Sequence, residues 1–172
     1  MSEIERLIRD VPNFPQEGIV FKDITPLLAD AEQLALAIQA MADPYREARV
    51  ERVVGIESRG FIFGMGIALE LGCGFVPVRK PGKLPFDVKR RDYALEYGTD
   101  AVEVHVDAVE SGQRVLVVDD VLATGGTMRA TCDLLGEMGA EITGVSFLME
   151  LSFLNGRGKL ADIDTITNLL TY

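Results

Sequence analysis

An apolar run that ends in two aspartates and a glycine pair constrains the fold of this chain more than any other feature. The run is VLVVDDVLATGGT, residues 115–127. Four consecutive apolar residues before turn-forming residues are typical of a strand that is covered on both faces. Such strands belong mainly to parallel sheets with helices on either side. We therefore predict an α/β fold with a doubly wound, mostly parallel sheet and helices on both faces.

Two βαβ units account for most of this predicted sheet. The first comprises a strand, an all-round apolar helix and a second strand, at residues 52–56, 61–71 and 75–78. The second has the same order, at residues 114–118, 127–138 and 142–149, with Gly139 closing its helix. A chain of 172 residues that is 48% hydrophobic fills one core, so we predict a single domain over residues 1–172.

The N-terminal arm, residues 1–28, is predicted to begin with a short amphipathic helix that carries Ile4, Leu7 and Ile8. Three prolines and Gly18 predict an ordered but irregular segment over residues 12–26. Asp30 and Gln33 then form a capping-box pattern that opens a helix over residues 31–41.

Cations are concentrated in the cation segment, residues 79–91, where six of them face one acid, Asp87, for a local balance of 6 − 1 = +5. Prolines and charges over residues 81–92 predict a long exposed loop, part of a mobile active-site loop at residues 80–97. Alternation at residues 93–97 and 102–106 predicts an antiparallel pair around Gly98, on one edge of the sheet. His105 lies in this pair, and we assign it no role because no second histidine exists to share a site.

Composition excludes several classes of function. A net charge of −10 argues against a general nucleic-acid binder. The one stretch that resembles a membrane span, residues 60–78, is broken by glycines and Pro77, and no targeting segment is apparent, so we expect a cytoplasmic protein. Cys73 and Cys132 have no CxxC spacing, so we expect core thiols rather than a zinc site or a disulfide.

The loop after the apolar run has the chemistry of a phosphate site. Gly125 and Gly126 allow backbone N–H groups to turn inward, Thr124 and Thr127 add hydroxyl donors, and a helix N-terminus follows. Carboxylates repel phosphate, so Asp119 and Asp120 suit sugar hydroxyls or a metal-bound water. This pattern indicates a ribose phosphate ligand. The alternative is a tight strand-to-helix connection with Thr127 as N-cap. Neither a Walker loop nor a GxGxxG fingerprint is present.

The same run resembles the phosphoribosyl pyrophosphate signature of the type I phosphoribosyltransferases. Three further runs make the chain similar to the adenine phosphoribosyltransferase family over nearly its whole length. They are NFPQEGIVFKDITPLL at residues 13–28, ESRGFIFG at 57–64, and VRKPGKLP with YALEYG between residues 78 and 98. The resemblance implies transfer of a phosphoribosyl group to N9 of adenine, which gives AMP and pyrophosphate in purine salvage, by a Mg²⁺-dependent homodimer.

The resemblance also implies a role for each matching residue. It implies that the phosphoribosyl pyrophosphate site comprises Asp119, Asp120, Ala123, Thr124, Gly125, Gly126, Thr127, Ser58, Arg59, Arg79, Lys80 and Lys83. It implies that adenine stacks on Phe21 near Arg59, and that backbone groups of Val20 and Lys22 read its edge. Glu96 resembles the general acid or base at N7 of adenine, beside the catalytic Asp119 and Asp120. No protein side chain is expected to bind Mg²⁺ directly.

Two other functions remain open at this point. One is a phosphoribosyltransferase for another base, such as hypoxanthine, xanthine or orotate, against which the arm with Val20 and Lys22 argues. The other is a regulator that senses phosphoribosyl pyrophosphate without turnover. The basic residues Arg90 and Arg91 exceed what we expect of this loop in similar proteins, and we interpret them as solvated charges rather than extra pyrophosphate contacts.

Overall fold

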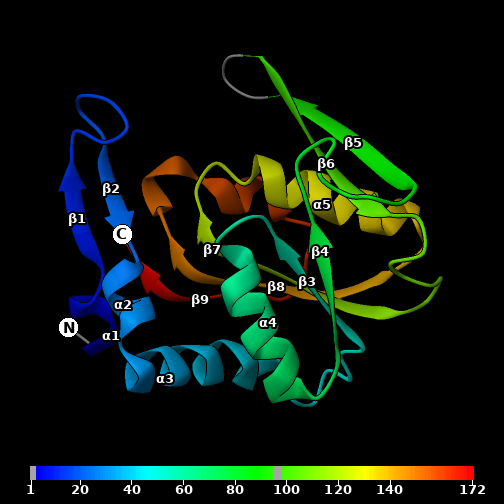
Figure 1. The fold of residues 1–172 in the computed structure, drawn as a ribbon, viewed down its shortest axis with the longest axis horizontal. Coiled ribbons are helices and arrows are strands. Elements are labelled where there is room, and N and C mark those ends of the chain that lie inside the picture. The colour runs from blue at the N-terminus through cyan, green and yellow to red at the C-terminus, as the bar shows by residue number, and fades with distance from the viewer. Residues whose placement is uncertain (1–2, 95–97) are drawn as a thin grey trace.

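A five-stranded parallel sheet forms the centre of the protein in the computed structural model, which describes residues 3–94 and 98–172 (Figure 1). The strand order is β4-β3-β7-β8-β9, and every neighbouring pair is parallel. The strands are β3 Arg52–Ile56, β4 Gly74–Val78, β7 Arg114–Leu122, β8 Glu141–Glu150 and β9 Ile166–Thr171. The chain winds outward from β3 to β4 and in the other direction from β7 to β9. The switch point of the sheet therefore lies between β3 and β7.

Strand β7 explains why the sheet is covered on both faces. Val115 and Val117 point into one hydrophobic cluster, and Leu116 and Val118 point into the other. All four side chains are fully buried. An alternating strand places successive side chains on opposite faces, so an unbroken apolar run needs two cores. The predicted doubly wound α/β fold is confirmed.

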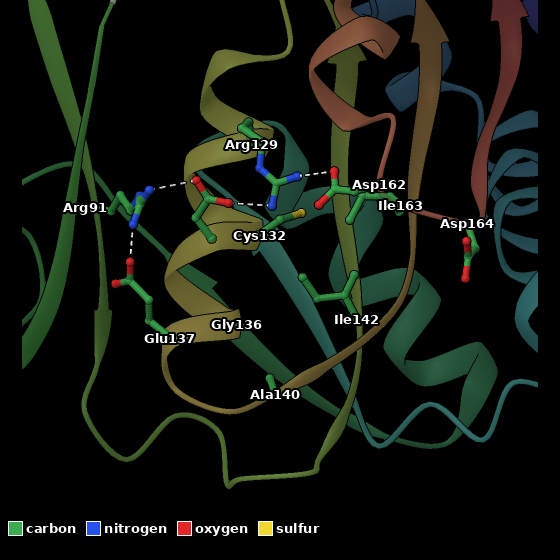
Figure 2. Close-up of a pocket in the computed structure, with 11 residues that line it drawn as sticks. Arg91, Arg129, Cys132, Gly136, Glu137, Ala140, Ile142, Asp162, Ile163 and Asp164 are labelled. Carbon is green, nitrogen blue, oxygen red and sulfur yellow. Dashed lines mark hydrogen bonds and ion pairs between the residues drawn. The ribbon is translucent and has the colours of Figure 1, made fainter.

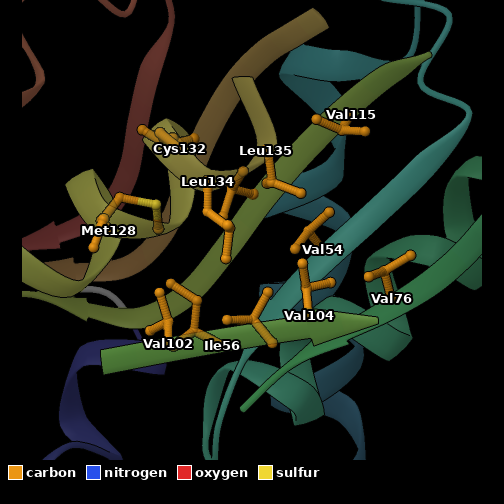
Figure 3. Packing of buried hydrophobic residues seen from close by; sticks show 14 of the residues in the cluster. Val54, Ile56, Val76, Val102, Val104, Val115, Met128, Cys132, Leu134 and Leu135 are labelled. Atoms are coloured by element: carbon orange, nitrogen blue, oxygen red, sulfur yellow. The ribbon is translucent and has the colours of Figure 1, made fainter. Parts of the chain in front are cut away.

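Helices cover the two faces as the βαβ pattern requires (Figure 1). One face carries α1 Glu3–Arg6, α2 Thr25–Ala29, α3 Ala31–Ala42 and α4 Gly60–Leu71. The other carries α5 Gly126–Glu137, which packs with the residues drawn in Figure 3. Asp30 caps α3 by accepting hydrogen bonds from the backbone N–H groups of Glu32 and Gln33. Gly139, at φ 86°, follows the end of α5 as predicted.

The N-terminal arm is more regular than the prolines suggested. Strands β1 Arg9–Pro12 and β2 Val20–Asp23 pair antiparallel, with Val11 opposite Phe21. The expectation of an irregular segment over residues 12–26 is therefore wrong for β2. The prolines are tolerated because Pro12 is the last residue of β1, Pro15 stands in the connection between the strands, and Pro26 lies in the first turn of α2, where its missing N–H is not needed. The arm is thus a ribbon that stands beside the main sheet (Figure 1).

The second half of the predicted exposed loop is a strand. β5 Val88–Ala94 pairs antiparallel with β6 Thr99–His105, from Val88 opposite His105 to Ala94 opposite Thr99. This hairpin forms a sheet of its own rather than an added edge strand. An isolated bridge between Arg79 and Glu103 joins it to the end of β4. Val102 and Val104 of β6 are buried over one face of the central sheet, so the hairpin belongs to a covering layer (Figure 3).

The remaining elements are short 3-10 turns, η1 Asp43–Tyr45, η2 Ser152–Leu154 and η3 Gly156–Leu160. Asp43 and Pro44 begin the first of these. Cys132 is buried as expected, whereas Cys73 is only half-buried, and both thiols are free. Within residues 3–94 and 98–172, no helix combines the length and the apolar character that a membrane crossing needs.

Candidate active site

The residues that follow β3 and those that end β7 meet at the switch point of the sheet. β7 continues four residues beyond its last pairing with β3, at Val118, and carries the aspartates of the acidic pair, Asp119 and Asp120. Gly60, which opens α4, lies so close that an added Cβ would stand 2.8 Å from Asp119 Oδ1. A glycine is needed here because any side chain would displace the carboxylate. The strand ends at which ligands bind in open α/β sheets are therefore also the ends that carry the acids.

The phosphate loop, residues 123–127, lines a hollow of about 160 Å³ together with the start of α5. Gly125 is the N-cap of α5 and has φ 74°, in the left-handed region that favours glycine. A Cβ at Gly125 would lie 2.5 Å from the carbonyl oxygen of Gly156 in η3. The loop therefore packs backbone against backbone on η3. The unpaired N–H groups of the first turn of α5 begin at this loop, so it has the geometry of an anion site.

The acidic pair is mostly enclosed. Asp120 is 4% exposed, and its Oδ2 lies 2.9 Å from Arg59 Nε while meeting no hydrogen-bond donor with good geometry among the described residues. Burial raises the pKa of Asp120, against the opposing charge of Arg59. Burial, and then the charge of Asp120, raise the pKa of Asp119. Two adjacent carboxyls, of which Asp120 is buried and Asp119 half-buried, are suited to bind hydroxyl donors or a hard cation.

Arg59 connects this acidic pair to the N-terminal arm. Its guanidinium lies 5.1 Å from the centroid of the Phe21 ring. The ring of Phe14 packs edge-on against Phe21 at 5.2 Å, so two aromatic rings of the arm lie together. Phe21 is half-buried, which leaves part of its ring open to a planar ligand. Val20 and Lys22 flank it two residues apart on one strand, so their backbone groups point the same way.

The cations of the first part of the cation segment converge on one carboxylate. Glu57 accepts from Arg79 Nε at 2.9 Å and from Lys83 Nζ at 2.7 Å. Burial opposes the charge of Glu57, but the hydrogen bonds from Lys83 and Arg79 outweigh it and lower its pKa. Ser58 follows through a cis peptide bond and precedes Arg59. Three predicted ligand residues, Arg79, Lys83 and Arg59, are thus grouped around the exit from β3.

Lys80 directs its ammonium group to the β5–β6 hairpin rather than to Glu57. Its Nζ donates to Tyr93 Oη at 2.8 Å and forms a close ion pair with Asp100. Tyr93 Oη also lies 2.9 Å from Thr127 Oγ1 in the phosphate loop. The hairpin therefore contacts both a predicted pyrophosphate residue and the predicted phosphate site.

Arg90 and Arg91 are not simply solvated. Arg90 pairs with Asp92 on its own strand at 2.6 Å. Arg91 pairs with Asp133 at 2.9 Å and with Glu137, and both acids belong to α5 (Figure 2). A hollow of about 450 Å³ opens beside these pairs and Arg129, away from the phosphate loop. The interpretation of Arg91 as a free surface charge is wrong, because the paired strand brings it over an acidic stretch of α5.

Sequence reasoning missed several residues that hold the site together. Glu57 and Tyr93 stand inside runs that carried the resemblance, so their contacts had a signal in the sequence, although no role was assigned to them. The contacts of Gly156 and Asp100 had no signal in the sequence, because their partners are distant along the chain. Glu96, the expected acid or base, lies outside the described residues, so the structure does not bear on it.

Comparison with known proteins agrees with this arrangement. The model of the phosphoribosyl transferase domain matches residues 24–168, so the chain belongs to that family. Within it, the chain is similar to an adenine phosphoribosyltransferase of Flavobacterium johnsoniae, at 52% identity over 99% of both chains.

Solved structures of adenine phosphoribosyltransferases are similar over the whole fold. That from Rhodothermus marinus is 51% identical, with a TM-score of 0.93 over 98% of this chain and 96% of its own. That from Saccharomyces cerevisiae, solved with adenine and an imino-altritol bisphosphate, is 39% identical, with a TM-score of 0.87 over 98% of this chain and 96% of its own.

Proposed function

We propose that this chain transfers the 5-phosphoribosyl group of phosphoribosyl pyrophosphate to N9 of adenine, which forms AMP and pyrophosphate. The observation that carries the proposal is that Arg59 joins the buried Asp120 of the acidic pair, beside the phosphate loop, to the aromatic ring of Phe21 in the arm. A sugar site and a flat aromatic site thus stand side by side. The relatives named above, which are adenine phosphoribosyltransferases, support adenine as the base.

The phosphoribosyl group is proposed to bind at the end of β7. Backbone N–H groups of residues 123–127 and the hydroxyl of Thr124 would hold the 5′-phosphate, helped by the N-terminal end of α5, while the hydroxyl of Thr127 contacts Tyr93. Asp119 and Asp120 would accept hydrogen bonds from the ribose hydroxyls. This division follows from charge, because the loop presents N–H donors at the start of α5 and the acidic pair presents mainly acceptors.

Adenine is proposed to stack on Phe21 and Arg59. Adenine presents an exocyclic amine as donor and N1 as acceptor, so a carbonyl and an N–H on one strand satisfy its edge. Val20 and Lys22 could provide this pair, since their backbone groups point the same way. A 6-oxopurine presents the opposite pattern and would leave buried groups unpaired, which is the physical source of discrimination.

Pyrophosphate would depart toward Ser58, Arg59, Arg79, Lys80 and Lys83. Cations already fixed near the leaving group stabilise its developing charge without reorganisation. Mg²⁺ fits the site, because the buried oxygen Asp120 Oδ2 has only the ion pair with Arg59 and no hydrogen-bond donor of good geometry among the described residues, and hard oxygen donors suit this ion. When bound through substrate oxygens and water, Mg²⁺ would neutralise charge on the pyrophosphate.

A homodimer and a cytoplasmic location remain predictions. The dimer is supported by exposed apolar side chains at helical spacing on α4, namely Ile62, Met65 and Leu69, of which Leu69 is 76% exposed. Burial of such a stripe against a second copy would remove it from water. Sedimentation of the purified protein tests the dimer, and cell fractionation tests the location.

The proposed function is tested by measuring AMP formation from phosphoribosyl pyrophosphate, Mg²⁺ and adenine, beside hypoxanthine, guanine, xanthine and orotate. We expect turnover with adenine alone. Turnover with another base would support the role of the phosphate loop and contradict the role of the arm in recognising adenine. Binding of phosphoribosyl pyrophosphate without turnover of any base would identify a sensor.

Glu96 is proposed to exchange a proton with N7 of adenine. Glu96→Gln keeps the shape of the side chain and removes its acid and base chemistry, so we expect kcat to fall by about 10²- to 10⁴-fold with little change in either KM. Steady-state kinetics measures this, and wild-type turnover would remove Glu96 from the mechanism. Asp87→Asn, at the one acid within the cation segment, provides a control for loss of charge nearby.

A further inference from the structure

The hydroxyl of Tyr93 stands between two groups that belong to opposite ends of the proposed substrate. Tyr93 Oη lies 2.9 Å from Thr127 Oγ1 in the phosphate loop and 2.8 Å from Lys80 Nζ on the pyrophosphate side. A third neighbour, Asp100 Oδ2, lies 3.1 Å away and also binds Lys80. A single phenol on the hairpin therefore contacts both ends of the site.

The hydrogen-bonding capacity of this phenol is fully used. A tyrosine hydroxyl has one proton to donate and two lone pairs to accept with. Ionised Asp100 can only accept, so it receives the phenol proton, and the Lys80 ammonium can only donate. The remaining lone pair then accepts from the hydroxyl of Thr127. With every position satisfied, Tyr93 fixes the distance between Lys80 and Thr127.

The charges in this cluster reinforce one another. Burial opposes the charge of Lys80, but the hydrogen bonds that Lys80 donates to Asp100 and Tyr93 outweigh it and raise the pKa of Lys80. Burial likewise opposes the charge of Asp100, and the hydrogen bonds from Lys80 and from the backbone of Ala101 lower its pKa. Lys80 thus stays protonated and Asp100 ionised around neutral pH, and the phenol is held between them.

The ring and the strand that carries it are anchored as well. A Cβ at Gly126 would stand 3.6 Å from Tyr93 Cδ2, so the ring lies against the backbone where α5 begins. The ring is half-buried and packs on the hydrophobic cluster of that face. Arg91, two residues earlier on the same side of β5, is tied to Asp133 and Glu137 of α5. The ring of Tyr93 and strand β5 both contact α5, the helix that begins at the phosphate loop. The position of the Tyr93 hydroxyl is therefore coupled to that of the phosphate loop.

We propose that Tyr93 and Asp100 are positioning residues, which hold the ammonium of Lys80 and residue Thr127 of the phosphate loop at the separation that one phosphoribosyl pyrophosphate molecule requires. This inference rests on the proposed function. Prearranged groups bind a two-ended ligand without first losing their own conformational freedom. The effect therefore falls on the intact substrate, whose two ends are bound together, and not on either end alone.

The direct test is Tyr93→Phe, which removes the hydroxyl and keeps the ring against Gly126. We expect KM for phosphoribosyl pyrophosphate to rise roughly tenfold, as the loss of hydrogen bonds to charged groups implies. The values of kcat and of KM for adenine should stay within about twofold, because neither the base nor the proton transfer is touched. Asp100→Asn should raise the same KM, since Lys80 loses its ionic partner. Asp92→Asn is the matched control on the same hairpin, because its carboxylate pairs with Arg90.

A second measurement separates positioning from a merely structural role. Calorimetry would compare the affinities of wild-type protein and Tyr93→Phe for phosphoribosyl pyrophosphate, for ribose 5-phosphate alone and for pyrophosphate alone. Positioning predicts that the variant loses more affinity for the intact molecule than for the two halves together. Equal losses for all three ligands, or a lower KM in the variant, would overturn the proposal. Wild-type protein that does not bind phosphoribosyl pyrophosphate would overturn the proposed function as well, whereas normal wild-type turnover beside an unchanged variant would remove the positioning role alone.

Discussion

The phosphate loop and the cation segment face the same proposed substrate, yet different forces hold them in place. The phosphate loop is fixed by backbone contact, since Gly125 and Gly156 approach too closely for any side chain between them. The cation segment is fixed by ion pairs, chiefly from Arg79 and Lys83 to Glu57 and from Lys80 to Asp100. Backbone packing does not depend on pH or salt, whereas ion pairs do. The phosphate loop is therefore the rigid half of the site. The cation segment is the adjustable half, because the ion pairs that hold it depend on pH and salt.

The largest effect is expected where backbone packing is broken. In Gly156→Ala the new methyl group would overlap the carbonyl oxygen of Ala123 and lie 3.1 Å from Gly125 N, so the phosphate loop must move. We expect KM for phosphoribosyl pyrophosphate to rise by at least about tenfold and stability to fall by about 1–3 kcal/mol, as for overpacking of a core. Kinetics and urea unfolding measure the two changes.

Gly136→Ala is the control for this variant. Gly136 lies in α5, and a Cβ there meets no atom of the described residues within 4 Å. Replacement should leave kinetics unchanged and stabilise the helix by about 0.5–1 kcal/mol. If Gly156→Ala bound substrate normally, the phosphate loop would be as adjustable as the cation segment, and the comparison would fail.

Acid should release the cation segment before it affects the phosphate loop. The pKa of Glu57 is lowered from 4.5, so the stability that its ion pairs contribute is fully present above about pH 4.5 and is lost as pH falls through the folded-state value. Arg79 and Lys83 are partly exposed, so this contribution is at most about 1 kcal/mol. Urea unfolding of wild-type protein and Glu57→Gln should differ at pH 7 and converge in acid. A difference that grew as the pH fell would contradict this assignment.

The same contrast explains which features the sequence could predict. The strand β7, the acidic pair and the start of α5 are consecutive along the chain, so one run of residues 115–127 specified them. The contact of the loop with Gly156 was not predictable, because it joins residues about thirty positions apart and depends on how η3 folds back. Local patterns specify local geometry, whereas backbone packing between distant segments requires the complete fold.

The cation segment was misread for a different reason. Its charges suggested a solvated loop, but residues 88–94 form β5, with Arg91 and Tyr93 facing α5 and their neighbours facing solvent. Alternation was present but was carried by a charged and an aromatic residue rather than by aliphatic ones. The partners of Arg91 lie on another element, so a count of local charge could not distinguish a paired arginine from a free one. The arm was misjudged similarly, because its prolines concealed the pairing of β1 with β2.

The smallest expected effect concerns Arg91, which links the two regions. Arg91 belongs to the cation segment, but its partners Asp133 and Glu137 belong to α5, the helix that begins at the phosphate loop. Arg91→Ala removes ion pairs that are partly exposed, so we expect a loss of about 0.5 kcal/mol in unfolding free energy. KM for phosphoribosyl pyrophosphate should stay within about twofold, because Tyr93 still contacts Thr127.

A double-mutant cycle with Glu137→Gln isolates this link, since Glu137 pairs with Arg91 across the hairpin and helix. Arg90→Ala is the matched control, because Arg90 pairs with Asp92 on the same strand and does not bridge to α5. A coupling energy near zero would mean that the pair with Glu137 contributes nothing, and that the hairpin is held on α5 by the Arg91–Asp133 pair, by Tyr93 and by apolar contacts. A large rise in KM for Arg91→Ala would mean instead that the position of the adjustable region depends on this ion pair. In that case α5 would determine the position of the cation segment through its ion pairs with Arg91.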